Sequence, residues 1–233
     1  MSLKLLVFIF VVLYGKWSVF GQTNQLIERK TYFSEQIYLY HKEYTYKAKR
    51  AYKIGKEEVA SSYYNQLLNN YLIGSYMDNF SASCLNTKKC CIDDYERPMI
   101  LMTYASWTVP TKGEIPALNE IVNKYKNEVD FVVLFWDQKS DVRKVAKNYN
   151  KSIHIIYVDE LKNRDAHIIK MLKHSIGFPT SFVIGSNKKI LEIQHNPQIP
   201  LSTPIKEAAL QSFENIERLV SQLLEYEAKI NHY

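Results

Sequence analysis

Three cysteines, Cys84, Cys90 and Cys91, offer the most varied chemistry in this sequence of 233 residues. A cysteine can form a disulfide, act as a thiolate nucleophile or bind zinc. These three form no CxxC pair, and the six histidines show no spacing that would complete a tetrahedral zinc site. We therefore expect no bound metal, and an odd number of cysteines leaves at least one thiol free or paired with another molecule.

The cysteines flank a predicted β-hairpin over residues 80–92 that turns at residues 86–89. With a two-residue loop at Thr87 and Lys88, Cys84 lies directly opposite Cys91, at a separation near the range that a disulfide accepts. We predict a Cys84–Cys91 disulfide. Cys84–Cys90 is the alternative if the loop is one residue shorter.

Composition excludes several classes of function. The seven glycines are scattered, and neither GxGxxG nor GxxxxGK[ST] occurs, so we expect no nucleotide cofactor. The formal net charge is +6, and without the first 21 residues it is +4, from 28 basic and 24 acidic residues. This small excess is spread along the chain, which argues against a nucleic-acid partner.

The first 21 residues have the features of a secretory signal peptide. Lys4 precedes an apolar run over residues 5–13, less than half of the roughly 20 residues that a membrane-spanning helix needs. Val19 and Gly21 suit the −3 and −1 positions, which predicts cleavage before Gln22. An uncleaved anchor and a buried strand are the alternatives. We expect a periplasmic or secreted protein with no membrane anchor after cleavage, in an oxidising compartment.

Residues 22–78 contain no proline and predict two helices joined by a short connection. Apolar and aromatic residues recur there at helical spacing, as listed here: Phe33, Ile37, Tyr40, Tyr44, Ala51 and Ile54, then Val59, Tyr63, Leu67 and Tyr71. Gly55 can end the first helix in the left-handed conformation. Ten tyrosines lie between Tyr32 and Tyr76, and we interpret them as packing residues with solvated hydroxyls rather than as a nucleic-acid or carbohydrate surface.

Residues 79–233 alternate between predicted strands and helices. The strands are predicted at residues 99–105, 130–136, 153–158, 181–184 and 189–193, and the helices at 114–126, 141–150, 166–174 and 203–230. Strand–helix–strand units predict a partly parallel sheet covered on both faces, and the terminal hairpin makes the sheet mixed. We predict an α/β domain with a mixed central sheet flanked by helices, preceded by an N-terminal helical hairpin.

The segment 104–118 resembles the motif A-[ST]-W-C-x-P-C-x-x-E-x-P-x-L of the TlpA/ResA-like thiol–disulfide oxidoreductases, which have a thioredoxin fold. The matching residues are Trp107, Pro110, Glu114, Pro116 and Leu118. About seventy residues later, the run from Gly177 to Thr180 resembles the G-[VIF]-P-T turn of the same family, whose proline is cis. The resemblance covers roughly residues 80–194 and implies a thioredoxin-like redoxin domain.

Both cysteine positions of the motif are threonine in this chain, Thr108 and Thr111. In the resembled family the first cysteine is a nucleophile at a helix N-terminus, where the helix dipole stabilises its thiolate, and the second resolves the mixed disulfide. A threonine hydroxyl ionises far too weakly for this chemistry, but threonine caps helix N-termini well. We therefore expect a degenerate site with no catalytic residues and no dithiol exchange.

Two other routes to catalysis are open in the sequence. Cys90 or Cys91 could carry out residual thiol–disulfide exchange or peroxide reduction, although hairpin strands lack the helix N-terminus that activates a thiol. Thr108 could act as a nucleophile if a histidine served as its base, and His174 is the nearest candidate. We favour a surface position at a helix end for His174.

The resemblance also implies a groove, because the cis-proline loop of the family lies beside the helix N-terminus and pairs with an extended substrate. The groove residues predicted here are Trp107, Thr108, Val109, Pro110, Phe178, Pro179 and Thr180. Backbone pairing needs no cysteine, so binding of a peptide or protein loop can persist without the chemistry. The function hypotheses are a redox-inactive binding module, a residual thiol enzyme, and a scaffold for the N-terminal helices.

Overall fold

The structure, a computed structural model, describes residues 29–108, 113–162, 166–195, 199–200 and 202–231. The predicted signal peptide therefore lies outside the described residues, as do Val109, Pro110 and Thr111 of the motif. Among the described helices, none combines the length and the apolar character needed to cross a membrane.

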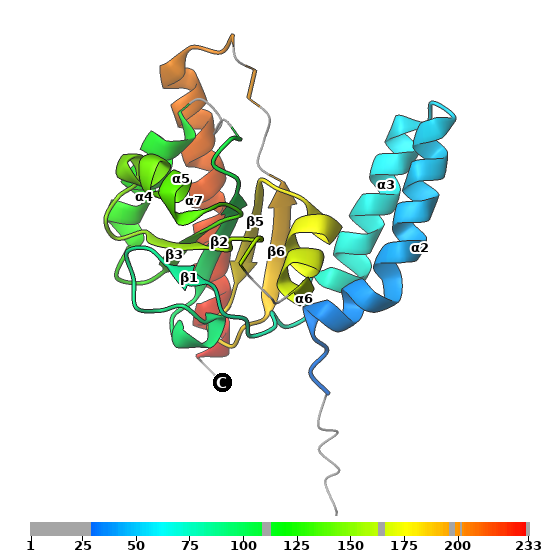
Figure 1. Cartoon of the computed structure of the whole chain (residues 1–233), viewed down its shortest axis with the longest axis horizontal. Coiled ribbons are helices and arrows are strands. Elements are labelled where there is room, and N and C mark those ends of the chain that lie inside the picture. Colours follow the sequence, from blue (N-terminus) through cyan, green and yellow to red (C-terminus); the bar gives the residue numbers. More distant parts are fainter. Residues whose placement is uncertain (1–28, 109–112, 163–165, 196–198, 201, 232–233) are drawn as a thin grey trace, which may run out of the picture.

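Six strands form one mixed sheet in the order β1-β4-β3-β2-β5-β6 (Figure 1). Their bounds are β1 Ser83–Cys84, β2 Met99–Tyr104, β3 Asp130–Phe135, β4 His154–Tyr157, β5 Thr180–Ile184 and β6 Ile190–His195. The three central strands, β2, β3 and β4, run parallel, whereas β1, β5 and β6 pair antiparallel with their neighbours. The predicted mixed α/β sheet is confirmed.

Helices cover both faces of this sheet. Their bounds are α2 Phe33–Lys53, α3 Glu57–Leu67, α4 Glu114–Tyr125, α5 Lys139–Val145, α6 Ala166–Ile168 and α7 Ile205–Ile230. Short π-helical turns, η1 at Leu68–Leu72 and η4 at Ile169–His174, continue α3 and α6, and 3₁₀ turns occupy η2 (Ile92–Asp94) and η3 (Ala146–Asn148). Helix α4 packs against α7 on one side of the sheet, and α6 lies on the other, beside the α2–α3 hairpin (Figure 1).

The central strands β2 and β3 are mostly apolar because both faces of the sheet are buried there. Side chains alternate between two hydrophobic clusters along β2: Met99 and Leu101 face the cluster under α2, α3 and η4, while Ile100 and Met102 face the cluster under α4 and α7. All six residues of β2 are buried, and so are all six of β3. This alternation holds the end of β2, where the motif begins, in a fixed position.

The α2–α3 hairpin, defined here as residues 33–72, is inserted into the core at its base and projects into solvent at its tip (Figure 1). Phe33 is fully buried, and its ring meets that of Phe182 edge to face at 5.9 Å. Leu67 and Leu72 are buried in the same cluster, whereas Tyr52 near the tip is 65% exposed. The helical prediction for this region is confirmed, and Gly55 has the positive φ expected at the end of α2.

Helix α4 begins at a glycine that approaches another helix closely. Gly113 has a φ of 88°, and a Cβ placed on it would lie 2.5 Å from the backbone nitrogen of Ala209 in α7. The Gly113→Ala variant should lose about 2–4 kcal/mol of unfolding free energy, because a left-handed alanine costs about 1–2 kcal/mol and forced overpacking adds a similar amount. Urea denaturation measures this loss.

Gly55→Ala provides the matched control, since Gly55 also has a positive φ but has no atom within 4 Å of the added Cβ. It should lose only the conformational cost of about 1–2 kcal/mol. Equal losses in the two variants would contradict the close approach of α4 and α7.

Candidate functional site

The motif lies at the carboxyl end of β2, where the chain turns toward α4. The Thr108 hydroxyl donates to the carbonyl of Ala105 at 2.6 Å, and the Thr108 N–H donates to the same carbonyl at 2.9 Å. Thr108 therefore closes a tight turn, and its hydroxyl is engaged with the backbone rather than with a histidine. The described N-cap of α4 is Gly113.

Two carboxylates accept hydrogen bonds from residues of the motif. The backbone N–H and the hydroxyl of Ser106 both donate to Asp137, at 2.5 and 2.8 Å, which ties the turn to the end of β3. Glu114 is buried in the first turn of α4 and accepts a hydrogen bond from the Tyr104 hydroxyl. Burial raises the pKa of Tyr149, and the negative charge of Glu114 raises it further, which places this carboxylate close to Tyr149 inside the domain.

Trp107 and Phe178 meet across the predicted groove. Their ring centroids are 5.5 Å apart in an edge-to-face arrangement, although the two residues are 71 positions apart in the sequence. Trp107 is 71% exposed, so its ring adds little to the hydrophobic core. The ammonium group of Lys173 lies 5.7 Å from the centroid of the Phe178 ring. The structure thus brings the described parts of both predicted walls together.

The Phe178–Pro179 peptide bond is cis. Within the described part of the chain, neither the N–H nor the C=O of Phe178 has a hydrogen-bond partner. Thr180 is buried, and its backbone carbonyl accepts from the Thr103 hydroxyl at 3.3 Å. Among the described residues, the backbone of Phe178 therefore has no partner, and the sheet begins two residues later at Thr180.

A histidine that sequence reasoning missed supports this loop from the other side. His195, the last residue of β6, places Nδ1 3.0 Å from the Thr180 hydroxyl and Nε2 2.6 Å from the Tyr64 hydroxyl. The Tyr64 ring stacks on the imidazole, and burial raises the pKa of Tyr64, so its hydroxyl stays protonated. This contact links α3 to the cis-proline loop. His174, the candidate base in the sequence, is exposed at the end of η4.

The cysteines form a separate feature at the far edge of the sheet. Cys84 is bonded to Cys90, so the predicted Cys84–Cys91 pairing is wrong and the alternative pairing is the one observed. The reason is the register: Ser81, not Cys84, lies opposite Cys91, and the loop between the paired segments is wider than the predicted two residues. Cys84 instead pairs through β1 with Ile156 of β4.

The free thiol, Cys91, is half-buried, and its Sγ lies 2.9 Å from the Ser81 hydroxyl. The Asp94 carboxylate accepts hydrogen bonds from the backbone N–H groups of Cys90 and Cys91. Reactive thiols sit in electropositive surroundings, so a carboxylate here disfavours catalysis. Three strand spacings, about 14 Å, separate β1 from β2 and its motif.

The disulfide assignment can be tested by two neighbouring substitutions. Cys90→Ser should lower the free energy of unfolding of the oxidised protein by about 2 kcal/mol, because it opens a seven-residue loop in the unfolded chain. Cys91→Ser should change it by less than about 0.5 kcal/mol. Denaturation of both variants without reductant checks this. A larger loss of unfolding free energy for Cys91→Ser than for Cys90→Ser would instead support the Cys84–Cys91 pairing.

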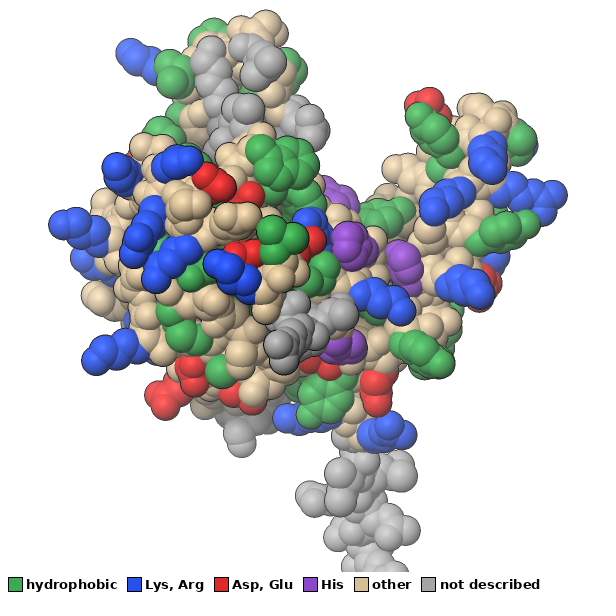
Figure 2. Space-filling model, viewed as in Figure 1, with side chains coloured by type: hydrophobic (Ala, Val, Ile, Leu, Met, Phe, Trp, Pro, Cys, Tyr) green, Lys and Arg blue, Asp and Glu red, His purple; other side chains and the backbone are tan. Residues whose placement is uncertain are grey.

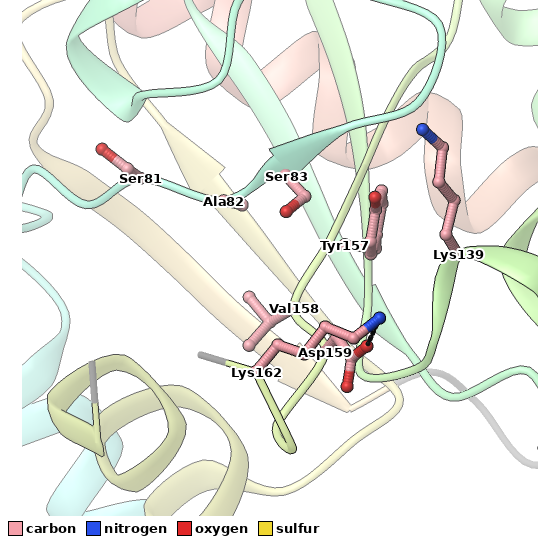
Figure 3. Close-up of a pocket in the computed structure, with 8 residues that line it drawn as sticks. All are labelled: Ser81, Ala82, Ser83, Lys139, Tyr157, Val158, Asp159 and Lys162. Carbon is pink, nitrogen blue, oxygen red and sulfur yellow. Dashed lines mark ion pairs between the residues drawn. The ribbon is translucent and has the colours of Figure 1, made fainter. Parts of the chain in front are cut away.

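A hollow of about 430 Å³ lies beside this edge of the sheet, next to β1 and the end of β4 (Figure 3). Its polar lining includes Ser81, Ser83 and Lys139, and the ammonium group of Lys162 pairs with Asp159 at 3.4 Å. No described residue of the predicted groove lines it. Among the described residues, no three histidine, cysteine or acidic side chains are arranged to hold a metal ion.

Comparisons with known proteins agree with this architecture. The chain is 29% identical over 122 residues to the thiol-disulfide oxidoreductase ResA of Bacillus thuringiensis subsp. konkukian, a match that covers 52% of this chain and 68% of that protein. It is 28% identical over 124 residues to a ResA of Bacillus cereus, with the same coverage.

Among solved structures, a putative protein disulfide isomerase from Bacteroides thetaiotaomicron aligns with a TM-score of 0.51 at 15% identity, over 69% of this chain and 95% of that one. This likeness concerns the fold, and it agrees with the predicted thioredoxin-like domain. The sequence profile of the AhpC/TSA family matches residues 73–193, just over half of the 233 residues. The resemblance to ResA-like redoxins is thereby confirmed, and the chain belongs to the AhpC/TSA family.

Proposed function

We propose that this chain is an exported redoxin-fold protein that binds an extended peptide or protein loop, without dithiol exchange, between Trp107 and Phe178. One observation carries the proposal: within the described residues, Phe178 presents an unpaired backbone N–H and C=O beside an exposed tryptophan. An unpaired backbone at the end of a strand can accept an added strand, and an exposed aromatic ring supplies contact area.

The chemistry of the motif supports binding rather than catalysis. Thr108 offers a hydroxyl that already donates to the Ala105 carbonyl, and the sequence places a second threonine, not a resolving cysteine, at position 111. A hydroxyl can neither form a mixed disulfide nor resolve one. Export is proposed from the apolar run behind Lys4, which predicts a signal peptide.

The exposure of Trp107 also argues against a purely structural role for the groove. A tryptophan that served only to hold the fold would bury its ring, as Trp136 does with 4% exposure. Trp107 instead keeps 71% of its surface in solvent. A large exposed aromatic side chain next to unpaired backbone is typical of an interaction surface.

Because Trp107 is exposed and Trp136 is buried, fluorescence quenching can test binding at the groove. In the chain from residue 22 onward, Trp107 and Trp136 are the tryptophans, so acrylamide quenching reports chiefly on Trp107. Saturation with a tryptophan-free unfolded polypeptide, its cysteines carbamidomethylated, should reduce quenching. The Trp107→Phe variant, which retains only the buried reporter, should show no change. Equal quenching with and without polypeptide would contradict binding at the groove.

A further inference from the structure

A second cleft lies between α2 and the α6–η4 helix. Its inner part, of about 240 Å³, is lined by His41 and Lys42 from α2 and by His167 and Lys170 from α6–η4. An adjoining hollow of about 570 Å³ shares Ser34, Tyr38 and His167 with it. Figure 2 shows histidine and lysine side chains gathered where the projecting hairpin meets the rest of the molecule.

Two lysines of this cleft, Lys42 and Lys170, have no partner among the described residues. Within the described residues, the ammonium groups of Lys42 and Lys170 form no ion pair and no hydrogen bond, although both side chains are exposed. Burial lowers the pKa of His41; a hydrogen bond to the Ser175 backbone opposes this, and the charges of Lys49 and Lys170 lower the pKa further. Nearby positive charge therefore contributes to the lowered pKa of His41.

Two described acids near the cleft, Glu35 and Asp78, are already engaged. Glu35 accepts hydrogen bonds from Arg29 and from the backbone N–H of Tyr32, each at 3.2 Å. Asp78 accepts from the backbone N–H and the hydroxyl of Ser34, at 2.8 and 2.5 Å. Among the described residues, neither carboxylate forms an ion pair with Lys42 or Lys170, so both ammonium groups are open to a carboxylate of another molecule.

Apolar side chains border the charged part of the cleft. Tyr38 is 84% exposed and Leu39 is 59% exposed, and both line the outer hollow. Large apolar side chains this exposed, next to two lysines that have no partner among the described residues, match a ligand that carries acidic and apolar groups side by side. A folded partner's surface or an extended segment rich in glutamate and leucine has this chemistry.

We propose that the cleft between α2 and α6–η4 binds an acidic peptide segment of a partner protein, with its carboxylates on Lys42 and Lys170 and an apolar side chain on Tyr38 and Leu39. The site is distinct from the groove at Phe178, because none of the described groove residues lines either hollow of the cleft. The positive net charge of the chain favours encounter with an acidic partner.

The test uses an acetylated peptide of alternating glutamate, leucine and phenylalanine, labelled for fluorescence anisotropy, with the full chain lacking residues 1–21. The Lys42→Ala/Lys170→Ala variant should bind it about fivefold more weakly, since two exposed ion pairs are lost. Lys53→Ala/Lys56→Ala at the hairpin tip removes the same charge outside the cleft and should bind as the parent does. Leu39→Ser should also weaken binding.

Three results would overturn the proposal. The first is equal weakening in the two lysine double variants, which would indicate attraction by net charge alone. The second is equal binding of a peptide in which glutamine replaces every glutamate. The third is tighter binding of a single-stranded oligonucleotide of the same charge, which would make the cleft a nucleic-acid site.

Discussion

Replacing both motif threonines by cysteine, in the T108C/T111C variant, is expected to create a dithiol that cycles between oxidised and reduced forms and reduces insulin with dithiothreitol as the electron donor. The unchanged chain should show no rate above the dithiothreitol background. The physical reason is that the support of the motif persists: Ser106 is held by Asp137, and Glu114 is held by Tyr104. A cysteine there would supply the thiolate that threonine cannot.

The variant is best made in a Cys91→Ser background, which removes the free thiol without opening the Cys84–Cys90 disulfide. T108S/T111S provides the matched control, because it makes the same kind of substitution without a thiol. A folded T108C/T111C protein that forms no second disulfide by mass spectrometry would show that the motif has lost the geometry of its relatives. Insulin reduction by the unchanged chain, surviving alkylation of its thiols, would contradict the proposal that the site is redox-inactive.

Truncating Phe33 to alanine is expected to lower the free energy of unfolding by about 3–5 kcal/mol, the usual cost of emptying a fully buried phenylalanine site. The ring of Phe33 contacts Phe182 in β5, and the Phe33 N–H donates to the Tyr76 carbonyl at 2.8 Å. The base of the α2–α3 hairpin is therefore part of the core of the sheet domain, not an independent appendage.

Tyr52→Ala is the matched control, since Tyr52 lies on the same helix with 65% of its surface exposed. It should change the free energy of unfolding by less than about 0.5 kcal/mol. Urea denaturation followed by Trp136 fluorescence measures both variants, because Trp136 is buried in the same hydrophobic cluster as Phe33. A loss below about 1 kcal/mol for Phe33→Ala would contradict a shared core.

The elements of the fold could be predicted from the sequence because their signals are local. The apolar run at residues 131–136 predicts a buried strand, and β3 occupies Asp130–Phe135. Spacing along residues 33–54 predicts a helix, and α2 spans Phe33–Lys53. In the same stretch Ile54 belongs to the predicted apolar stripe but is 65% exposed, because the hairpin tip extends beyond the sheet it packs on.

The site could be predicted only in part. Trp107 and Phe178 could be placed together because each belongs to a motif whose spatial relation is known from the resembled family. The support from His195 and Tyr64 could not, because these residues are 131 positions apart and meet only when α3 packs beside β6. The cysteine pairing failed for a related reason: it depends on the width of an irregular loop, which no periodic pattern specifies.

Hydrogen–deuterium exchange at the Phe178 amide tests the central claim most directly. This N–H has no partner within the described residues, so it should exchange rapidly in the free protein. Saturation with an unfolded, carbamidomethylated polypeptide should slow its exchange, because an added strand would accept its hydrogen bond. An unchanged rate at Phe178 under saturation, or protection confined to α2 and α3, would contradict a peptide-binding groove at the cis-proline loop.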